Sequence, residues 1–286
     1  MGWDCRQVRL AIGDGTFSPV SYRTSLPRWV RYPGPMRRFY LAGLLLLAAC
    51  GRGGPSDATE AVVVAAASNL DRAIPRLMEG FEASTGLKAV VSLGSTSNLT
   101  QQIENGAPFV FFLSGVAAHV DQLVAGGFAE ADSKYVYARG RLALWARKVA
   151  PLDLSGPEAL LDPGVKYVSI ANPAFAPYGI AAEQALKRLG YLDRLQGKIV
   201  YAQNPSMTQQ HAASGDADIA MTAVSLTKDS DGKSYELDAA LYEPIEQALA
   251  VLVTALHKDS AYGFARYMSE PRARAILNEF GYGPGD

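Results

Sequence analysis

The sequence contains few of the residues from which metal centres and disulfide frameworks are built. Its 286 residues include two cysteines, Cys5 and Cys50, and three histidines, His119, His211 and His257. Two cysteines that far apart make neither a CxxC motif nor a structural zinc site. The histidines have no metal-ligand spacing, so we interpret them as surface or packing residues and expect neither a metal cation nor a cofactor.

An excess of charge of one sign is also missing. Lys and Arg number 27 and Asp and Glu number 28, with no basic stripe and no RNA-binding aromatic motif. A nucleic-acid partner is therefore not expected. The hydrophobic content of 49% is sufficient for one or two sizeable cores, and the composition is neither repetitive nor disordered. These totals favour a globular α/β protein.

An apolar run near the N-terminus is too short to cross a membrane. Residues 36–49 begin with Met-Arg-Arg, continue with apolar residues and end in small residues before Cys50, as a signal peptide does. The eleven residues 39–49 are too few to span a bilayer. Residues 47–50, Leu-Ala-Ala-Cys, resemble the bacterial lipobox, which implies cleavage before Cys50 and attachment of lipid to it.

A lipoprotein signal also indicates the roles of the segments on either side of it. Residues 50–60 are short and polar and predict a flexible tether. Residues 1–35 precede a complete signal peptide, so we expect Met36 to be the initiator and residues 1–35 to be a non-native extension. A plain secretory signal and a trimmed hydrophobic tail are the alternatives. We expect a periplasmic or extracytoplasmic protein that an N-terminal lipid anchors to the membrane.

Cleavage makes the remaining chain acidic. Residues 1–49 hold seven of the basic and two of the acidic residues, so the mature part has a net charge of −6. Its overall field does not attract anions, and an anionic ligand would depend on local hydrogen-bond donors.

The stretch 62–71 sets a pattern for the rest of the chain. An apolar run that reads as a buried strand ends abruptly at Ser68 and Asn69. Ser68 and Asp71 have the spacing of a capping box, which predicts a helix over 69–84. The first N–H groups of such a helix point beyond the carboxyl end of the strand, where α/β proteins bind anions.

Three further junctions repeat this pattern, each directly after a predicted strand. They lie at residues 95–97, 177–179 and 206, and Ser206 with Gln209 again has capping-box spacing. The junctions offer donors and have no Lys or Arg beside them, which suits a small oxyanion whose oxygens only accept. Capping explains any single junction, whereas convergence of four favours a ligand site.

The order of predicted elements is that of two α/β lobes. Alternating strands and helices over 62–125 predict a parallel sheet covered on both faces. Strands at 135–138 and 142–146 mark the passage to a second lobe, a polar loop is predicted at 228–234, and a strand at 248–255 returns.

We therefore predict a two-lobed α/β fold. Each lobe is expected to be a mainly parallel sheet flanked by helices, and the ligand cleft is expected between the lobes. Residues 61–141 plus 247–286 form lobe 1 in this prediction, and residues 142–246 form lobe 2.

Four short motifs, in this order, resemble one family. They are AAASNL at 65–70, GSTSNL at 94–99 with QQIENGAP at 101–108, APYG at 176–179, and the C-terminal residues 261–282. Together they are similar to the periplasmic molybdate-binding proteins of ABC transporters. The resemblance implies a monomeric type II periplasmic binding protein, not an enzyme, that closes over molybdate or tungstate and delivers it to a membrane permease.

The resemblance also implies site residues. The first serine of the family site falls on Ser68, followed by Asn69. The second falls on Thr96, with Ser95 beside it, so the hydroxyl is kept and a methyl group is added. The backbone amide of the third junction falls on Tyr178.

The sequence departs from the family pattern at three positions. The fourth amide falls on Pro205, which has no N–H, so Ser206 or Met207 is expected to supply it. A tyrosine used by some members falls near Ala223, and an acidic residue usual in relatives is Val110 here. The candidate ligand-binding residues are Ser68, Asn69, Ser95, Thr96, Tyr178, Ser206 and Met207.

Three alternatives remain open at this point. The first is a binding protein for another oxyanion, sulfate or thiosulfate. The second is a lipid-anchored serine hydrolase that uses a junction serine with His211, although residues 94–97 lack the glycine of a nucleophile elbow. The third is a diverged member that acts as a sensor or surface protein without a permease.

Overall fold

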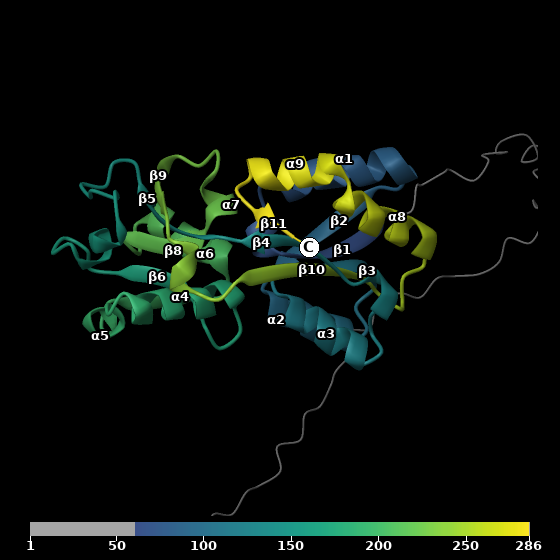
Figure 1. The fold of residues 1–286 in the computed structure, drawn as a ribbon, viewed down its shortest axis with the longest axis horizontal. Coiled ribbons are helices and arrows are strands. Elements are labelled where there is room, and N and C mark those ends of the chain that lie inside the picture. Colours follow the sequence, from purple (N-terminus) through teal and green to yellow (C-terminus); the bar gives the residue numbers. More distant parts are fainter. Residues whose placement is uncertain (1–60, 286) are drawn as a thin grey trace, which may run out of the picture. The chain divides into compact units, whose positions relative to one another are not determined.

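The computed structural model describes residues 61–285, in which the chain forms two β-sheets flanked by helices (Figure 1). The predictions for the extension at 1–35, the signal peptide at 36–49, the lipid on Cys50 and the tether at 50–60 fall outside these residues. Between residues 61 and 285, no helix is both long enough and apolar enough to cross a membrane.

The first sheet has six strands in the order β11-β4-β10-β3-β1-β2. These strands are β1 Val62–Ala67, β2 Ala89–Gly94, β3 Phe109–Ser114, β4 Tyr135–Gly140, β10 Ile245–Val251 and β11 Gly283–Pro284. The second sheet has five strands in the order β7-β6-β8-β5-β9. They are β5 Leu142–Arg147, β6 Val168–Ala171, β7 Ile199–Ala202, β8 Ile219–Ala223 and β9 Gly232–Glu236.

Both sheets are mixed. β1 pairs in parallel with β2 and β3, and β6 pairs in parallel with β7 and β8. The strands on which the chain passes between the lobes, β4, β5 and β10, pair antiparallel with their neighbours. The predicted two-lobed α/β architecture is confirmed, and the mainly parallel pairing holds for the strands that lead into the four junctions.

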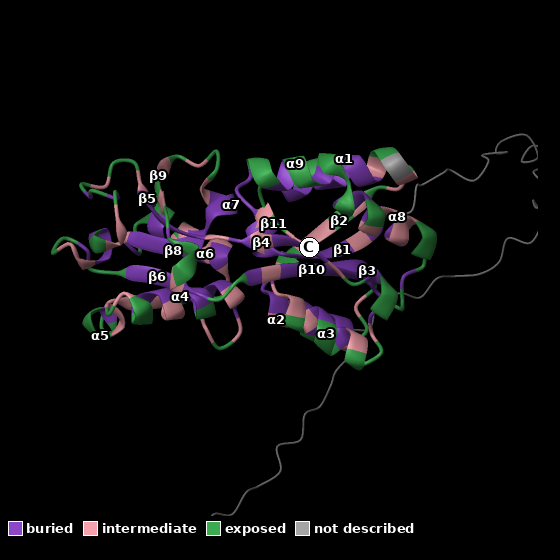
Figure 2. Cartoon of the chain, viewed as in Figure 1, coloured by how far each residue is buried: buried purple, intermediate pink, exposed green. Residues whose placement is uncertain are grey.

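Helices cover both faces of each sheet (Figure 1). The first lobe has α1 Ile74–Thr85, α8 Lys258–Ser269 and α9 Pro271–Glu279 on one face, and α2 Thr96–Glu104 and α3 Ala117–Ala125 on the other. The second lobe has α4 Pro177–Arg188, α5 Leu192–Leu195, α6 Pro205–Ser214 and α7 Val224–Thr227. Figure 2 shows that the central strands of each sheet are buried between helices whose outer faces are exposed, as expected for strands with apolar runs.

Each lobe has its own apolar core. In the first, the rings of Phe81, Phe111 and Phe264 meet, and Phe111 and Phe264 stack with centroids 4.4 Å apart. In the second, α6 packs on the sheet through Ala212, which lies against Trp145. The lobes are therefore separate packing units joined by the passing strands.

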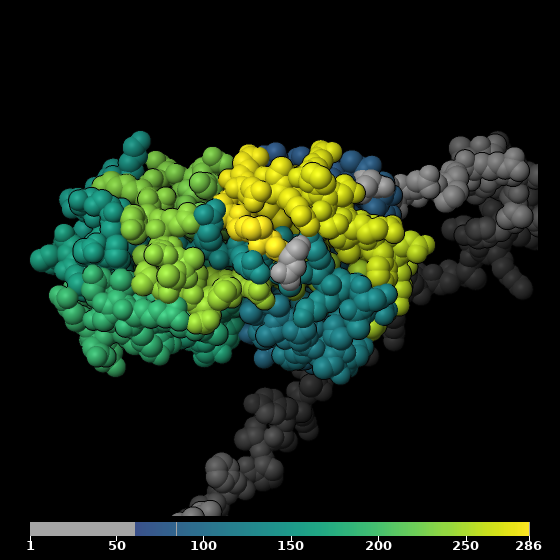
Figure 3. Space-filling model, viewed as in Figure 1, coloured from purple at the N-terminus to yellow at the C-terminus, as the bar shows by residue number. Residues whose placement is uncertain are grey.

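The C-terminal segment also bridges the lobes. Arg141 Nε, between β4 and β5, donates to the carbonyl oxygen of Gly281 at 2.7 Å. A Cβ at Gly281 would lie 2.5 Å from Val224 Cγ1, so the C-terminal chain is in close contact with α7. The space-filling view shows these yellow C-terminal atoms against green atoms of the second lobe (Figure 3).

Three predicted boundaries are wrong. The helix predicted over 69–84 is a 3₁₀ turn, Ser68–Leu70, followed by α1 from Ile74, because Pro75 fits only the first turn of a helix. The strand predicted at 248–255 is β10, which begins at Ile245 and ends at Val251. The loop predicted at 228–234 contains the start of β9, a polar edge strand without an alternating apolar pattern.

Candidate functional site

A small cavity lies where the four junctions meet between the lobes. Its volume is about 10 Å³. The first lobe contributes Ala67, Ser68, Asn69, Gly94, Ser95, Thr96 and Gly115, and the second contributes Ala176, Pro177, Tyr178, Asn204 and Pro205. None of these described lining residues is charged. Five of the seven predicted ligand-binding residues therefore line one cavity, and Ser206 and Met207 lie outside it.

Ser68 has an unusual side chain for a buried serine. It is 5% exposed, and its Oγ makes no hydrogen bond to any residue between 61 and 285. The predicted capping box with Asp71 is wrong, because Ser68 opens a 3₁₀ turn whose N-cap is Ala67. A buried hydroxyl without a hydrogen-bond partner lowers the stability of the fold by about 1 to 3 kcal/mol, so the Ser68 hydroxyl can donate to a group from outside the described chain.

The second junction presents Ser95 and Thr96. Ser95 is the N-cap of α2, and its Oγ accepts from the N–H of Asn98 at 3.4 Å. Thr96 Oγ1 accepts from the N–H of Gly115 at 3.1 Å, which leaves its hydroxyl proton to donate. A Cβ at Gly115 would lie 2.9 Å from Thr96 Oγ1, so a glycine is required there. Gly115 was missed by the sequence analysis.

The third junction is the start of α4. Pro177 occupies the first helical position, as predicted, and Tyr178 follows with an N–H for which the helix itself has no acceptor. A Cβ at Gly179 would lie 2.2 Å from the carbonyl oxygen of Ala171. The helix start is therefore pressed against the end of β6, which fixes the direction of the Tyr178 N–H.

The fourth junction is capped by Asn204. Its Oδ1 accepts from the N–H of Met207 at 2.9 Å, so the predicted capping box of Ser206 and Gln209 is wrong. Pro205 has no N–H, and the N–H of Met207 is used by the cap. Ser206 therefore carries the first-turn N–H of α6 that is not used by the cap. Asn204 was missed although an Asn-Pro pair at a helix start is a capping signal.

Three hydroxyl groups close the lobes on each other. Ser206 Oγ donates to the carbonyl oxygen of Ser68 at 2.9 Å, and Ser225 Oγ donates to that of Asn69 at 2.7 Å. From the first lobe, Ser97 Oγ donates to the carbonyl oxygen of a residue in the second, Phe175, at 2.8 Å. The structure is thus a closed form, in which the cavity walls come from both lobes.

The side chain of Asn69, a residue that lines the cavity, is part of a buried polar network. Its Nδ2 donates to Gln247 Oε1 and to the hydroxyl of Tyr282, both at 2.9 Å. Burial raises the pKa of Tyr137 and Tyr178 well above the ordinary tyrosine value, and the other buried tyrosine hydroxyls add to the effect. Burial likewise raises the pKa of Tyr282. The hydroxyls of this network stay protonated.

The two histidines near serines do not form the predicted hydrolase arrangement. His211 Nδ1 lies 3.0 Å from the Oγ of Ser169, a fully buried serine of β6, and not beside a junction serine. His119 Nε2 lies 3.1 Å from Ser97 Oγ, whose proton is directed to a carbonyl oxygen. His119 Nδ1 faces the amide oxygen of Gln122 at 3.3 Å, where a catalytic triad has a carboxylate.

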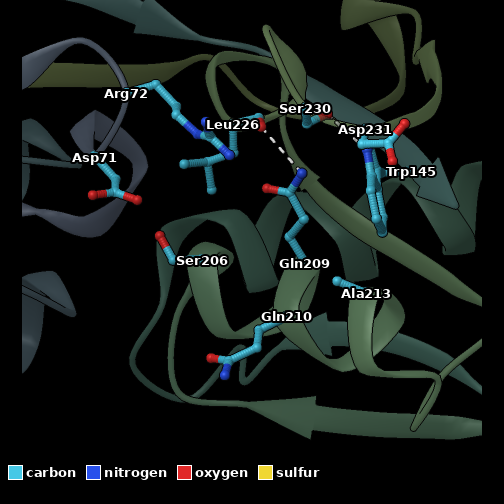
Figure 4. Close-up of a pocket in the computed structure, with 10 residues that line it drawn as sticks. All are labelled: Asp71, Arg72, Trp145, Ser206, Gln209, Gln210, Ala213, Leu226, Ser230 and Asp231. Atoms are coloured by element: carbon cyan, nitrogen blue, oxygen red, sulfur yellow. Dashed lines mark hydrogen bonds between the residues drawn. The ribbon is translucent and has the colours of Figure 1, made fainter. Parts of the chain in front are cut away.

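A larger pocket of about 420 Å³ opens beside the site and is shown in Figure 4. Arg72 extends over Leu226 at one wall, and two carboxylates, Asp71 and Asp231, line it as well. A pocket that is open to solvent and lined by both a cationic and two anionic side chains does not favour an anionic ligand. The hydroxyls and helix starts converge on the smaller cavity instead. Ser206 lines the larger pocket and contacts Ser68, so it separates the two.

Val110 and Ala223 mark the other two departures from the family pattern. Both are buried in strands, β3 and β8, and neither is among the described residues that line the cavity. Within residues 61–285, therefore, neither position contributes to the cavity wall.

Comparisons with known proteins agree with this geometry. The family model described as bacterial extracellular solute-binding protein matches residues 62–283. The molybdate-binding protein ModA of Azotobacter vinelandii is 34% identical over 244 residues, which are 83% of this chain and 96% of that protein. ModA of Rhodobacter capsulatus is 31% identical over 260 residues, which are 91% of this chain and 98% of that protein.

A solved structure shares the fold as well. The periplasmic molybdate-binding protein of Azotobacter vinelandii aligns with a TM-score of 0.72 at 33% identity, covering 77% of this chain and 98% of that one. The chain therefore belongs to the bacterial extracellular solute-binding proteins and is similar to their periplasmic molybdate-binding members.

Proposed function

We propose that this chain binds molybdate or tungstate between its lobes and delivers it to an ABC permease. The observation that carries the proposal is the hydroxyl of Ser68, which is buried in the cavity wall without a hydrogen-bond partner among the described residues. The names of the relatives above 30% identity support molybdate as the ligand.

The donor set suits a fully deprotonated tetrahedral anion. The hydroxyls of Ser68 and Thr96 line the cavity from the first lobe, and Tyr178 lines it from the second. Ser206, whose N–H the cap does not use, follows the lining residue Pro205 in the chain and would add this N–H to the set. Charge-assisted hydrogen bonds from neutral donors hold an anion without burying a cation beside it. Helix starts add the positive end of the helix dipole. Met207 is not needed in this set, because its N–H is occupied by Asn204.

The size of the cavity sets how the anion enters. A volume of about 10 Å³ is close to the space of one water molecule, which is less than four oxygens around a metal require. The lobes must separate to admit the anion, and when they close on it the two cavity walls must stay slightly farther apart than in this structure. Contacts with both lobes make affinity greater in the closed state, which is the condition for ligand-driven closure.

The remaining parts of the proposal concern the setting of the protein. It is a non-enzymatic monomer, held outside the cytoplasm by a lipid on Cys50. Residues 61–141 plus 247–286 form one lobe and residues 142–246 the other. Replacing Cys50 by Ser should move the expressed protein from the membrane fraction to the soluble extracytoplasmic fraction, and an unchanged distribution would contradict the anchor.

A thermal-shift screen tests the ligand. Purified protein is melted with molybdate, tungstate, sulfate, thiosulfate or phosphate, since a ligand that binds only the native state raises the melting temperature. We expect shifts with molybdate and tungstate. A shift with sulfate or thiosulfate alone would assign the site to a smaller oxyanion, and no shift with any of them would refute the oxyanion function.

A further inference from the structure

Gln247 is a fully buried polar residue on one of the strands that join the lobes. Its exposed fraction is 0%, and it lies on β10 where the pairing with β4 shifts register between Gln247 and Ala248. A bulge of this kind redirects a side chain. The side chain of Gln247 accordingly meets polar groups from both lobes.

The amide of Gln247 makes hydrogen bonds in both directions. Its Oε1 accepts from Asn69 Nδ2 and from the hydroxyl of Tyr137, both at 2.9 Å. Its Nε2 donates to the hydroxyl of Tyr178 at 3.1 Å. Reversing the amide would place a donor against Asn69 Nδ2, so the network specifies one orientation.

These partners connect directly to the two walls of the anion site. Asn69 follows Ser68 in the chain, and Tyr178 carries the N–H at the start of α4. The hydroxyl end of Tyr178 reaches the passing strand β4 so closely that a Cβ at Gly140 would lie 2.3 Å from it and 2.7 Å from Gln247 Nε2. The close approach at Gly140 is a second observation that the contact is built into the fold.

We propose that Gln247 is the positioning residue that sets the two halves of the anion site in register. It touches no ligand and acts through Asn69 in the first lobe and Tyr178 in the second. When the lobes close, all three bonds of the amide are made inside the protein. When they part, Tyr178 leaves with the second lobe and the buried Nε2 loses its acceptor, which favours closure.

This inference rests on the proposed function for its ligand and can be tested apart from it. The variants are Gln247→Met, which keeps the length and removes the amide, and Tyr178→Phe, which removes one oxygen and keeps the backbone N–H. Ser169→Ala is the matched control, because Ser169 is equally buried and bonds only to His211 within the second lobe.

The first measurement is a double-mutant cycle of affinity. Each single variant should raise the dissociation constant for molybdate about tenfold by calorimetry, the size of the one hydrogen bond between Gln247 and Tyr178 that both variants remove and that joins the lobes. The double variant should bind no more weakly than the weaker single variant, because both changes remove the same link. Ser169→Ala should lower the melting temperature and leave the dissociation constant unchanged. If the variants have a lower melting temperature but bind molybdate like wild type, Gln247 has a structural role only and the proposal is overturned. It is also overturned if the effects of the two substitutions on the free energy of binding add in the double variant.

The second measurement needs no ligand. Small-angle X-ray scattering of the protein without added oxyanion should give a larger radius of gyration for Gln247→Met and Tyr178→Phe than for wild type and Ser169→Ala. Equal radii would overturn the proposal. If wild type binds no oxyanion while the radii differ as expected, the proposed ligand is wrong and the positioning role stands. If Gln247→Met does not fold, the dissociation constant and the radius of gyration of Tyr178→Phe, each compared with those of Ser169→Ala, test the proposal without the cycle.

Discussion

Replacing Ser68 by Ala should make the protein more stable and a weaker binder at the same time. Ser68 is 5% exposed, and its hydroxyl has no hydrogen-bond partner within residues 61–285. Folding therefore removes the hydroxyl from water without giving it a new hydrogen bond. Removing it should raise the unfolding free energy of the ligand-free protein by about 1 to 3 kcal/mol. The same change removes a donor to a charged ligand and should weaken binding by about 1 to 3 kcal/mol, or roughly 5- to 150-fold.

The assay is urea unfolding without ligand, followed by calorimetric titration with the oxyanion that gives the largest thermal shift. Ser169→Ala is the control, since its Oγ lies 3.0 Å from His211 Nδ1 and is satisfied. That variant should lose about 1 kcal/mol of stability and keep its affinity. A Ser68→Ala protein that is destabilised and binds like wild type would show that the hydroxyl serves the fold, and would refute its assignment to the ligand.

Three further outcomes follow from the junctions and the buried network. Gly179→Ala would place a Cβ 2.2 Å from the carbonyl oxygen of Ala171, so it should displace the start of α4. Calorimetry should then detect no oxyanion binding to this variant, whereas Ser169→Ala, also in the second lobe, should still bind. Asn204→Ala removes the cap on the Met207 N–H and should cost about 1 kcal/mol in urea unfolding; no loss would contradict the cap. Burial raises the pKa of Tyr282 in the folded protein, whereas its pKa is near the ordinary value of about 10 in the unfolded chain, so its contribution to stability is complete below about pH 10 and is lost as the pH rises further. Tyr282→Phe should therefore make the fall of the unfolding free energy at alkaline pH less steep by about 1.4 kcal/mol per pH unit. An unchanged slope would contradict the burial of Tyr282.

The sequence was informative wherever the signal is local. Strands that end at Ser, Asn or Pro followed by helix starts predict the junctions, because these residues act within three or four positions of the chain. The two-lobed α/β fold followed from the order of such units. The same local reasoning failed at Pro75, which moves the start of α1 to Ile74, and at Asn204, which takes the cap from Ser206.

What could not be read from the sequence depends on contacts between distant residues. Asn69 and Gln247 are 178 positions apart, and only the tertiary fold brings the amides together. The register shift at Gln247 has no sequence pattern of its own, and Gly115 is required by the position of Thr96 across the sheet. Which N–H groups remain for a ligand at a junction likewise depends on which side chain occupies the cap.

The three hydroxyl-to-carbonyl bonds between the lobes have a kinetic consequence. Ser97, Ser206 and Ser225 donate to main-chain oxygens across the cleft, and no ligand group takes part in these bonds. These bonds stabilise the closed form through protein groups, and in that form the cavity of about 10 Å³ does not admit an incoming anion. Only molecules that have opened can capture one, so the observed association rate should rise with anion concentration to a plateau set by how often the lobes part.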